Sequence, residues 1–100
     1  MTLNQLKMDM LKARKEKDEL RMAVLSFLIS AINNKEIEMR GSGEELGDEH
    51  VAQVLKKQIK NRGQSMEAYE KAGRAELVER EGAEKEVLEE IQNAYFPEQA

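Results

Sequence analysis

The spacing of apolar positions along this chain predicts four helices and no strand. Between residues 2 and 13, apolar side chains recur every three or four positions, which is the period of one helical face. Three later segments repeat this spacing, and none shows the alternation that indicates a strand. The sequence therefore predicts an all-α fold, a small four-helix assembly with two N-terminal helices and a longer helical hairpin.

Local signals indicate where the first two helices begin and end. Thr2 with Gln5 three positions later has the spacing of a capping box, so we expect the first helix to begin there. Asp18 is a good N-cap for the second helix, because its carboxylate can accept a hydrogen bond from a free backbone N–H. Gly41-Ser42-Gly43 is predicted to end that helix.

The third and fourth helices form the predicted hairpin. Asp48 opens the third helix, where its charge favours the positive end of the helix dipole. Gly63 interrupts the apolar stripe of this helix and indicates a kink, a close approach by a neighbouring helix, or a weak point. Gly73 suits the C-cap position, and the fourth helix is predicted from about Arg74 to Asn93.

The second helix has the widest apolar arc. One face carries Leu20, Val24, Phe27, Leu28, Ala31 and Ile32. An adjoining face carries Met22, Leu25 and Ile29. We therefore expect this helix to lie at the centre of the core, or else also to contact a partner.

Composition narrows the class of protein. One hundred residues fit one domain, and the mixture of 36% charged and 4% aromatic residues favours helices. Cysteine is absent, which excludes disulfides, thiolate zinc sites and thiol nucleophiles. No signal peptide is visible, and the apolar run from Met22 to Ile32 is too short to span a bilayer. These features predict a cytoplasmic protein.

Charge is distributed unevenly along the chain. Residues 73–100 carry 3 basic and 8 acidic groups, whereas residues 51–66 contain no carboxylate. Lys56, Lys57, Lys60 and Arg62 in the latter stretch are the predicted nucleic-acid-binding residues, since a phosphate backbone would relieve their mutual repulsion. A second basic cluster comprises Lys12, Arg14, Lys15 and Lys17. The alternative interpretation is that both clusters are solvated faces.

Residues that could support catalysis do not form a recognisable set. His50 has no second histidine at ligand spacing, and Ser26 and Ser30 lie in an apolar helix with no base nearby. Glu81 and Glu84 share a helical face, but Arg80 and Lys85 beside them indicate ordinary helix ion pairs. We therefore predict no catalytic residue, no metal site, no cofactor and no small-molecule substrate.

Several segments resemble the GatB/YqeY family, which comprises small bacterial YqeY proteins and the tail of the aspartyl/glutamyl-tRNA amidotransferase B subunit. The clearest are Tyr69-Glu70-Lys71-Ala72-Gly73-Arg74-Ala75-Glu76-Leu77 and the ending Tyr95-Phe96-Pro97-Glu98-Gln99. Looser elements are Lys17-Asp18 with Arg21-Met22-Ala23-Val24-Leu25, Ala31-Ile32 with Glu36-Ile37, and Val54-Leu55 with Ile59-Lys60-Asn61-Arg62.

The resemblance implies a helical domain over residues 1–100 that is linked to glutamine-dependent tRNA amidation, a carbon–nitrogen ligase reaction that other domains and subunits catalyse. It also implies that a further, smaller helical module follows in family members and is missing here. The expected partners are tRNA and an amidotransferase or another protein. The alternative is a protein-interaction scaffold without RNA binding, which docks a partner through the second helix or the acidic fourth helix.

Overall fold

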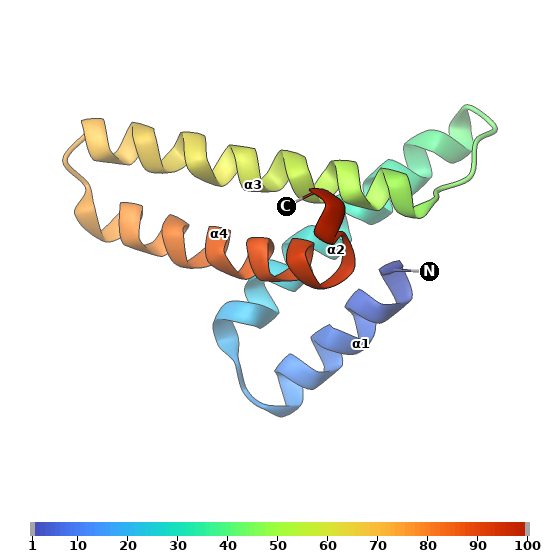
Figure 1. The fold of residues 1–100 in the computed structure, drawn as a ribbon, viewed down its shortest axis with the longest axis horizontal. Coiled ribbons are helices and arrows are strands. Elements are labelled where there is room, and N and C mark those ends of the chain that lie inside the picture. The colour runs from blue at the N-terminus through green and yellow to red at the C-terminus, as the bar shows by residue number, and fades with distance from the viewer. Residues whose placement is uncertain (1, 100) are drawn as a thin grey trace. The chain divides into compact units, whose positions relative to one another are not determined.

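The computed structural model describes residues 2–99, which form α-helices and one short 3₁₀ helix without any strand (Figure 1). The elements are α1 (Thr2–Lys15), α2 (Glu19–Gly41), α3 (Asp48–Lys71), α4 (Ala75–Tyr95) and η1 (Pro97–Gln99). The predicted all-α class with four helices is therefore confirmed, with each predicted boundary within about two residues of the observed one. None of the helices in the described part of the chain is long and apolar enough to cross a membrane.

Contacts divide the chain into two compact units. The first unit is Met1–Val54 and contains α1, α2 and the start of α3. The second unit is Leu55–Ala100 and contains the rest of α3 together with α4 and η1. The boundary falls within the continuous helix α3.

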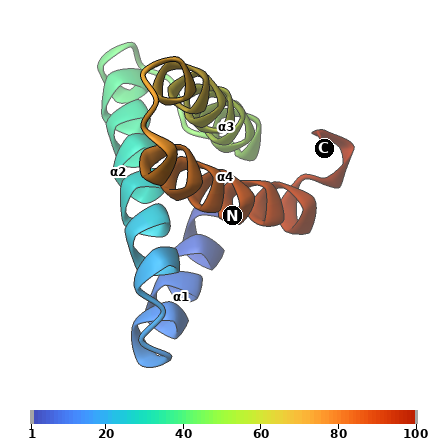
Figure 2. The same ribbon diagram turned by 90° about the vertical axis from the view of Figure 1, so that its left-hand side faces the viewer.

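In the first unit, α1 lies beside α2 as a helical hairpin (Figures 1 and 2). The buried apolar side chains of α1 are Leu3, Leu6 and Ala13. Those of α2 are Val24, Leu25, Leu28, Ile32 and Met39. Burying one leucine side chain fully contributes about 1.5–3 kcal/mol, so these residues dominate the stability of the unit.

Two large apolar residues on the first face of α2 are exposed. Leu20 is 39% exposed and Phe27 is 62% exposed, so the wide apolar arc of α2 extends beyond the buried core. Leu25, assigned to the adjoining face, is buried. Residues two apart on a helix point about 200° away from each other, so a helix that buries Leu25 turns Phe27 outward. Because the apolar arc of α2 is wide, the sequence alone did not show which of these two side chains is buried.

Glycine ends two of the helices as predicted. Gly43 after α2 and Gly73 after α3 have positive φ angles of 76° and 71°, a backbone conformation that glycine adopts without steric cost. At both ends, the N–H of the residue after the glycine donates to the carbonyl five residues earlier, at 2.9 Å. This is the Schellman arrangement, which satisfies carbonyls that the helix itself leaves unpaired.

The connection between α1 and α2 has the same geometry without a glycine. Lys17 takes the left-handed position with φ of 58°, and the N–H of Asp18 donates to the carbonyl of Ala13 at 2.9 Å. A side chain in this conformation costs about 1 kcal/mol or more. Asp18 is confirmed as the N-cap of α2, since its carboxylate accepts from the backbone N–H of Arg21 at 3.0 Å.

The start of α1 differs from the predicted capping box. In a capping box at Thr2 the side chain of Gln5 would accept from the backbone N–H of Thr2. That N–H donates instead to the carboxylate of Asp48 at 2.9 Å. Asp48 is the first residue of α3, so one carboxylate connects the N-terminal ends of two helices in the first unit. A partner 46 residues away leaves no local sequence signal.

In the second unit, α4 turns back from Gly73 along the later part of α3 (Figure 1). The apolar residues Val87, Leu88, Ile91 and Phe96 are buried towards the C-terminal end of α4. The close approach that Gly63 suggested is found at Gly82, where an added Cβ would lie 3.3 Å from Cε of Met66. No atom lies within 4 Å of a Cβ built at Gly63.

Candidate nucleic-acid interface

Three of the four predicted binding residues lie exposed on α3. Lys56, Lys57 and Lys60 occupy little more than one turn of the helix, and all three side chains are exposed. Lys56 and Lys60 are four residues apart and share a face, with Lys57 at its edge. Since α3 carries no carboxylate between residues 51 and 66, this face presents positive charge without a neutralising neighbour on the same stretch of helix. We call these residues the lysine face.

Arg62 does not belong to the lysine face. It follows Lys60 by two residues and therefore points about 200° away from it around the helix. Its Nη1 atom lies 2.8 Å from Oε2 of Glu81 and 3.1 Å from Oε2 of Glu84. The three side chains are only 24%, 14% and 18% exposed, so water screens these ion pairs less than it screens a surface pair. The structure places Arg62 between α3 and α4, inside the second unit.

The partner of Glu81 and Glu84 was not found from the sequence. Their neighbours in α4 suggested ion pairs within that helix, and Arg80 does approach Glu84 to 3.9 Å, but its side chain is 71% exposed. The shorter contacts come from Arg62, which lies 19 and 22 residues earlier. One signal in the sequence could have revealed this pairing. Arg62 follows Ile59 by three residues and precedes Met66 by four, so this arginine occupies a position of the apolar stripe of α3.

The second basic cluster lies in the first unit. Lys12, Arg14 and Lys15 are exposed in the last turn of α1, and Lys17 follows in the turn to α2. Positive side chains at the C-terminal end of a helix interact favourably with its dipole. This stabilisation accounts for the cluster without any ligand.

His50 supports the start of α3. Its Nδ1 atom accepts a hydrogen bond from the backbone N–H of Gly47 at 2.9 Å, and an oxygen of Glu49 lies 3.5 Å from the same atom. Among residues 2–99, no three His, Cys, Asp or Glu side chains are arranged to hold a metal ion.

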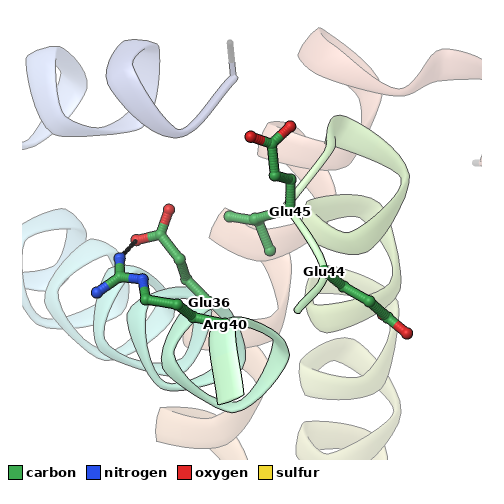
Figure 3. A pocket seen from close by; sticks show the side chains of 5 residues that line it. Glu36, Arg40, Glu44 and Glu45 are labelled. Carbon is green, nitrogen blue, oxygen red and sulfur yellow. Dashed lines mark ion pairs between the residues drawn. The ribbon is translucent and has the colours of Figure 1, made fainter. Parts of the chain in front are cut away.

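An open pocket of about 490 Å³ lies in the first unit, at the end of α2 and in the connection to α3 (Figure 3). Its lining consists of Glu36, Arg40, Glu44, Glu45 and Leu46. Figure 3 shows Arg40 directed towards Glu36, 3.9 Å away, while Glu44 points away from both. Three carboxylates against one guanidinium make the lining net negative, which disfavours anions. The lining also provides no nucleophile with a base beside it, so the pocket gives no basis for a catalytic assignment.

Comparison with protein families identifies the chain. The model of the YqeY-like protein family matches residues 3–100, which is nearly the whole sequence. The chain belongs to the YqeY-like family. Its resemblance to this family, which rested on the segments around Gly73 and Pro97, is thereby confirmed.

Two curated relatives of this YqeY-like chain carry the same name, "Altered inheritance of mitochondria protein 41, mitochondrial". The protein from Lachancea thermotolerans is 39% identical over 83 residues, which cover 83% of this chain and 43% of the relative. The protein from Kluyveromyces lactis is 36% identical over 89 residues, which cover 89% of this chain and 47% of the relative. The chain thus spans less than half the length of both relatives.

The relatives correct one prediction. The sequence features favoured a cytoplasmic protein, but both relatives are named as mitochondrial proteins, so the cytoplasmic assignment was wrong. That assignment rested on the lack of cysteine and of a visible targeting segment, and neither feature distinguishes one reducing compartment from another. Neither relative's name mentions tRNA or an amidotransferase.

Proposed function

We propose that this YqeY-like domain is an RNA-binding accessory module that positions tRNA phosphates on the lysine face of α3. In this proposal the domain serves glutamine-dependent tRNA amidation, or a related tRNA-dependent step, by holding RNA, while other domains or subunits perform the chemistry. The observation that carries the proposal is the group of three exposed lysines on a stretch of helix that has no carboxylate.

Lysine favours phosphate contacts over base recognition. Its ammonium group is a compact charge with three donors, which binds phosphate oxygens without reading the sequence of the nucleic acid. We therefore expect the lysine face to recognise the backbone of a folded RNA. Arg62 is not included, because Glu81 and Glu84 already engage its guanidinium.

The acidic character of α4 limits where RNA can lie. Residues 73–100 carry a net charge of −5, and the whole chain carries −4. A phosphate backbone is repelled by this segment and attracted to the lysine face, which orients the RNA along α3. The same net charge predicts modest affinity, since strong indiscriminate binders of nucleic acid are typically basic throughout.

Replacing Lys56 and Lys60 together with alanine tests the proposal. Each lost phosphate contact lowers the slope of log K against log salt by roughly 0.7–0.9, so the double variant should reduce the slope by roughly 1.4–1.8. Its affinity for tRNA near physiological salt should fall about tenfold. Fluorescence anisotropy with labelled bulk tRNA over a salt series measures both quantities.

The matched control is Lys7→Ala with Lys71→Ala, which removes the same charge at two exposed positions outside the lysine face. This control should leave the salt slope unchanged and weaken binding only slightly through the net charge. Equal losses in both double variants would mean that general charge, and not the lysine face, attracts the RNA. Binding that is unaffected by Lys56→Ala with Lys60→Ala would refute the proposed interface.

A further inference from the structure

The exposed side of α2 carries a regular stripe of uncharged residues. Their spacing alternates between three and four residues over most of the helix, and every one of them is exposed: Leu20, Ala23, Phe27, Ser30, Asn34 and Ile37. Alternation of three and four is the seven-residue repeat of a coiled-coil contact. We call these residues the α2 seam.

The seam lies opposite the buried side of the same helix. Leu25, Ile32 and Met39 also repeat every seven residues, and they are 1%, 0% and 4% exposed. They occupy the heptad position farthest from the two seam positions. The helix therefore has one apolar side inside the protein and a second, uncharged side outside it, which explains why the arc of α2 was too wide to assign to a single core face.

The side chains of the α2 seam match those of a second, antiparallel copy in size. A two-fold axis between residues 28 and 29 sets Leu20 opposite Ile37, Ala23 opposite Asn34, and Phe27 opposite Ser30 of a second copy. The largest side chain thus faces a small one, as close packing requires. A parallel pairing would set Phe27 against Phe27 and Ala23 against Ala23, which crowds one level of the contact and leaves a gap at another.

The flanking charges favour the same arrangement. Glu19 and Arg40 occupy equivalent flanking positions at opposite ends of the seam, and an antiparallel pairing brings each close to the opposite charge on the second copy. A second copy of this chain therefore matches the α2 seam in both size and charge.

We propose that the α2 seam is a contact surface between two copies of this chain, packed antiparallel about a two-fold axis near residues 28 and 29. Three large apolar side chains from each copy, Leu20, Phe27 and Ile37, supply most of the buried area. Small and polar residues occupy the other seam positions, so the contact is weak and reversible, with a dissociation constant in the micromolar range.

Sedimentation equilibrium over the micromolar range tests the contact. The wild-type chain should show a monomer–dimer equilibrium, and Phe27→Glu should weaken it about a hundredfold by placing a charge at the centre of the seam. Met8→Glu is the matched control, since Met8 is an exposed apolar residue of α1 outside the seam, and it should leave dimerisation unchanged. Ser30→Glu provides a second disrupting variant if Phe27→Glu does not fold.

Disulfide trapping tests the orientation, because the chain contains no cysteine of its own. Mixing Ala23→Cys with Asn34→Cys under mild oxidation should give the mixed dimer in excess over either self-dimer. Ala94→Cys on the exposed surface of α4 reports random collisions. A wild-type chain that remains monomeric, a dimer that Phe27→Glu leaves intact, or preferential self-pairing of Ala23→Cys would each overturn the proposal.

Discussion

The two units of this chain hold their helices together by different means. In the first unit, α1 and α2 pack as a hairpin with fully buried leucines such as Leu6 and Leu28. In the second, the middle of α3 meets α4 at an arginine paired with two carboxylates, with Met66 against Gly82 one turn further on. Buried apolar residues lie at the other end of α4.

The contrast separates two uses of charge on the same helix. Arg62 contributes to folding, since removing it takes the closest cation from two largely buried carboxylates. The lysine face contributes little to folding, since its side chains are exposed and repel one another. Basic residues that are adjacent in sequence therefore differ in how much they contribute to folding, and substitutions can measure this difference.

The largest effect on stability should come from the apolar core of the first unit. Leu28→Ala removes a completely buried side chain and should lower the free energy of unfolding by about 3 kcal/mol. Leu11→Ala removes the same atoms from an exposed position and should change it by less than about 0.5 kcal/mol. Urea unfolding followed by circular dichroism measures both, and similar losses would contradict the assigned core.

Arg62→Ala should give the next largest loss of stability. It should lower the free energy of unfolding by about 2 kcal/mol, a value between those for buried and for exposed ion pairs. Arg80→Ala is the matched control, because Arg80 approaches the same Glu84 from an exposed position and should cost less than about 0.5 kcal/mol. A double-mutant cycle of Arg62→Ala with Glu81→Gln should give a coupling energy of about 1 kcal/mol. Additive losses would show that the two side chains do not interact in solution.

The smallest effects concern the helix connections, one of which lacks the glycine found in the others. Lys17→Gly should stabilise the first unit by about 0.5 kcal/mol, because relief of the left-handed conformation outweighs the added freedom of the unfolded chain. Gly73→Ala should destabilise the second unit by about 1 kcal/mol, although an added Cβ meets no neighbour there. Thermal unfolding of the two variants measures both changes in stability. Changes of the same sign would argue against the assigned backbone conformations.

Much of the fold could be predicted because its signals are local. Asp18 caps a helix by bonding a backbone N–H three residues away, and Gly73 ends one through its own φ angle. What could not be predicted depends on distant partners. The link from Asp48 to Thr2 spans 46 residues, and the exposure of Phe27 follows from which side of a wide apolar arc is covered.

The candidate site divides in the same way. Clustering in the sequence pointed to Lys56, Lys57 and Lys60 because charge runs are visible without a structure, and the structure shows that these three side chains are exposed. It also included Arg62, since adjacency in sequence does not show which side of a helix a residue occupies. Only the position of α4 reveals that this arginine faces Glu81 and Glu84.

A titration of the chain with bulk tRNA, at low and at near-physiological salt, shows directly whether the lysine face of α3 holds RNA. Duplex DNA of equal charge, titrated separately under the same conditions, serves as the control. If the lysine face holds RNA, tRNA should bind more tightly than DNA, and log K should fall with log salt with a slope of roughly 2 to 3 for three phosphate contacts. Binding no tighter than that of the DNA control at either salt concentration would contradict the account and leave the domain as a protein scaffold.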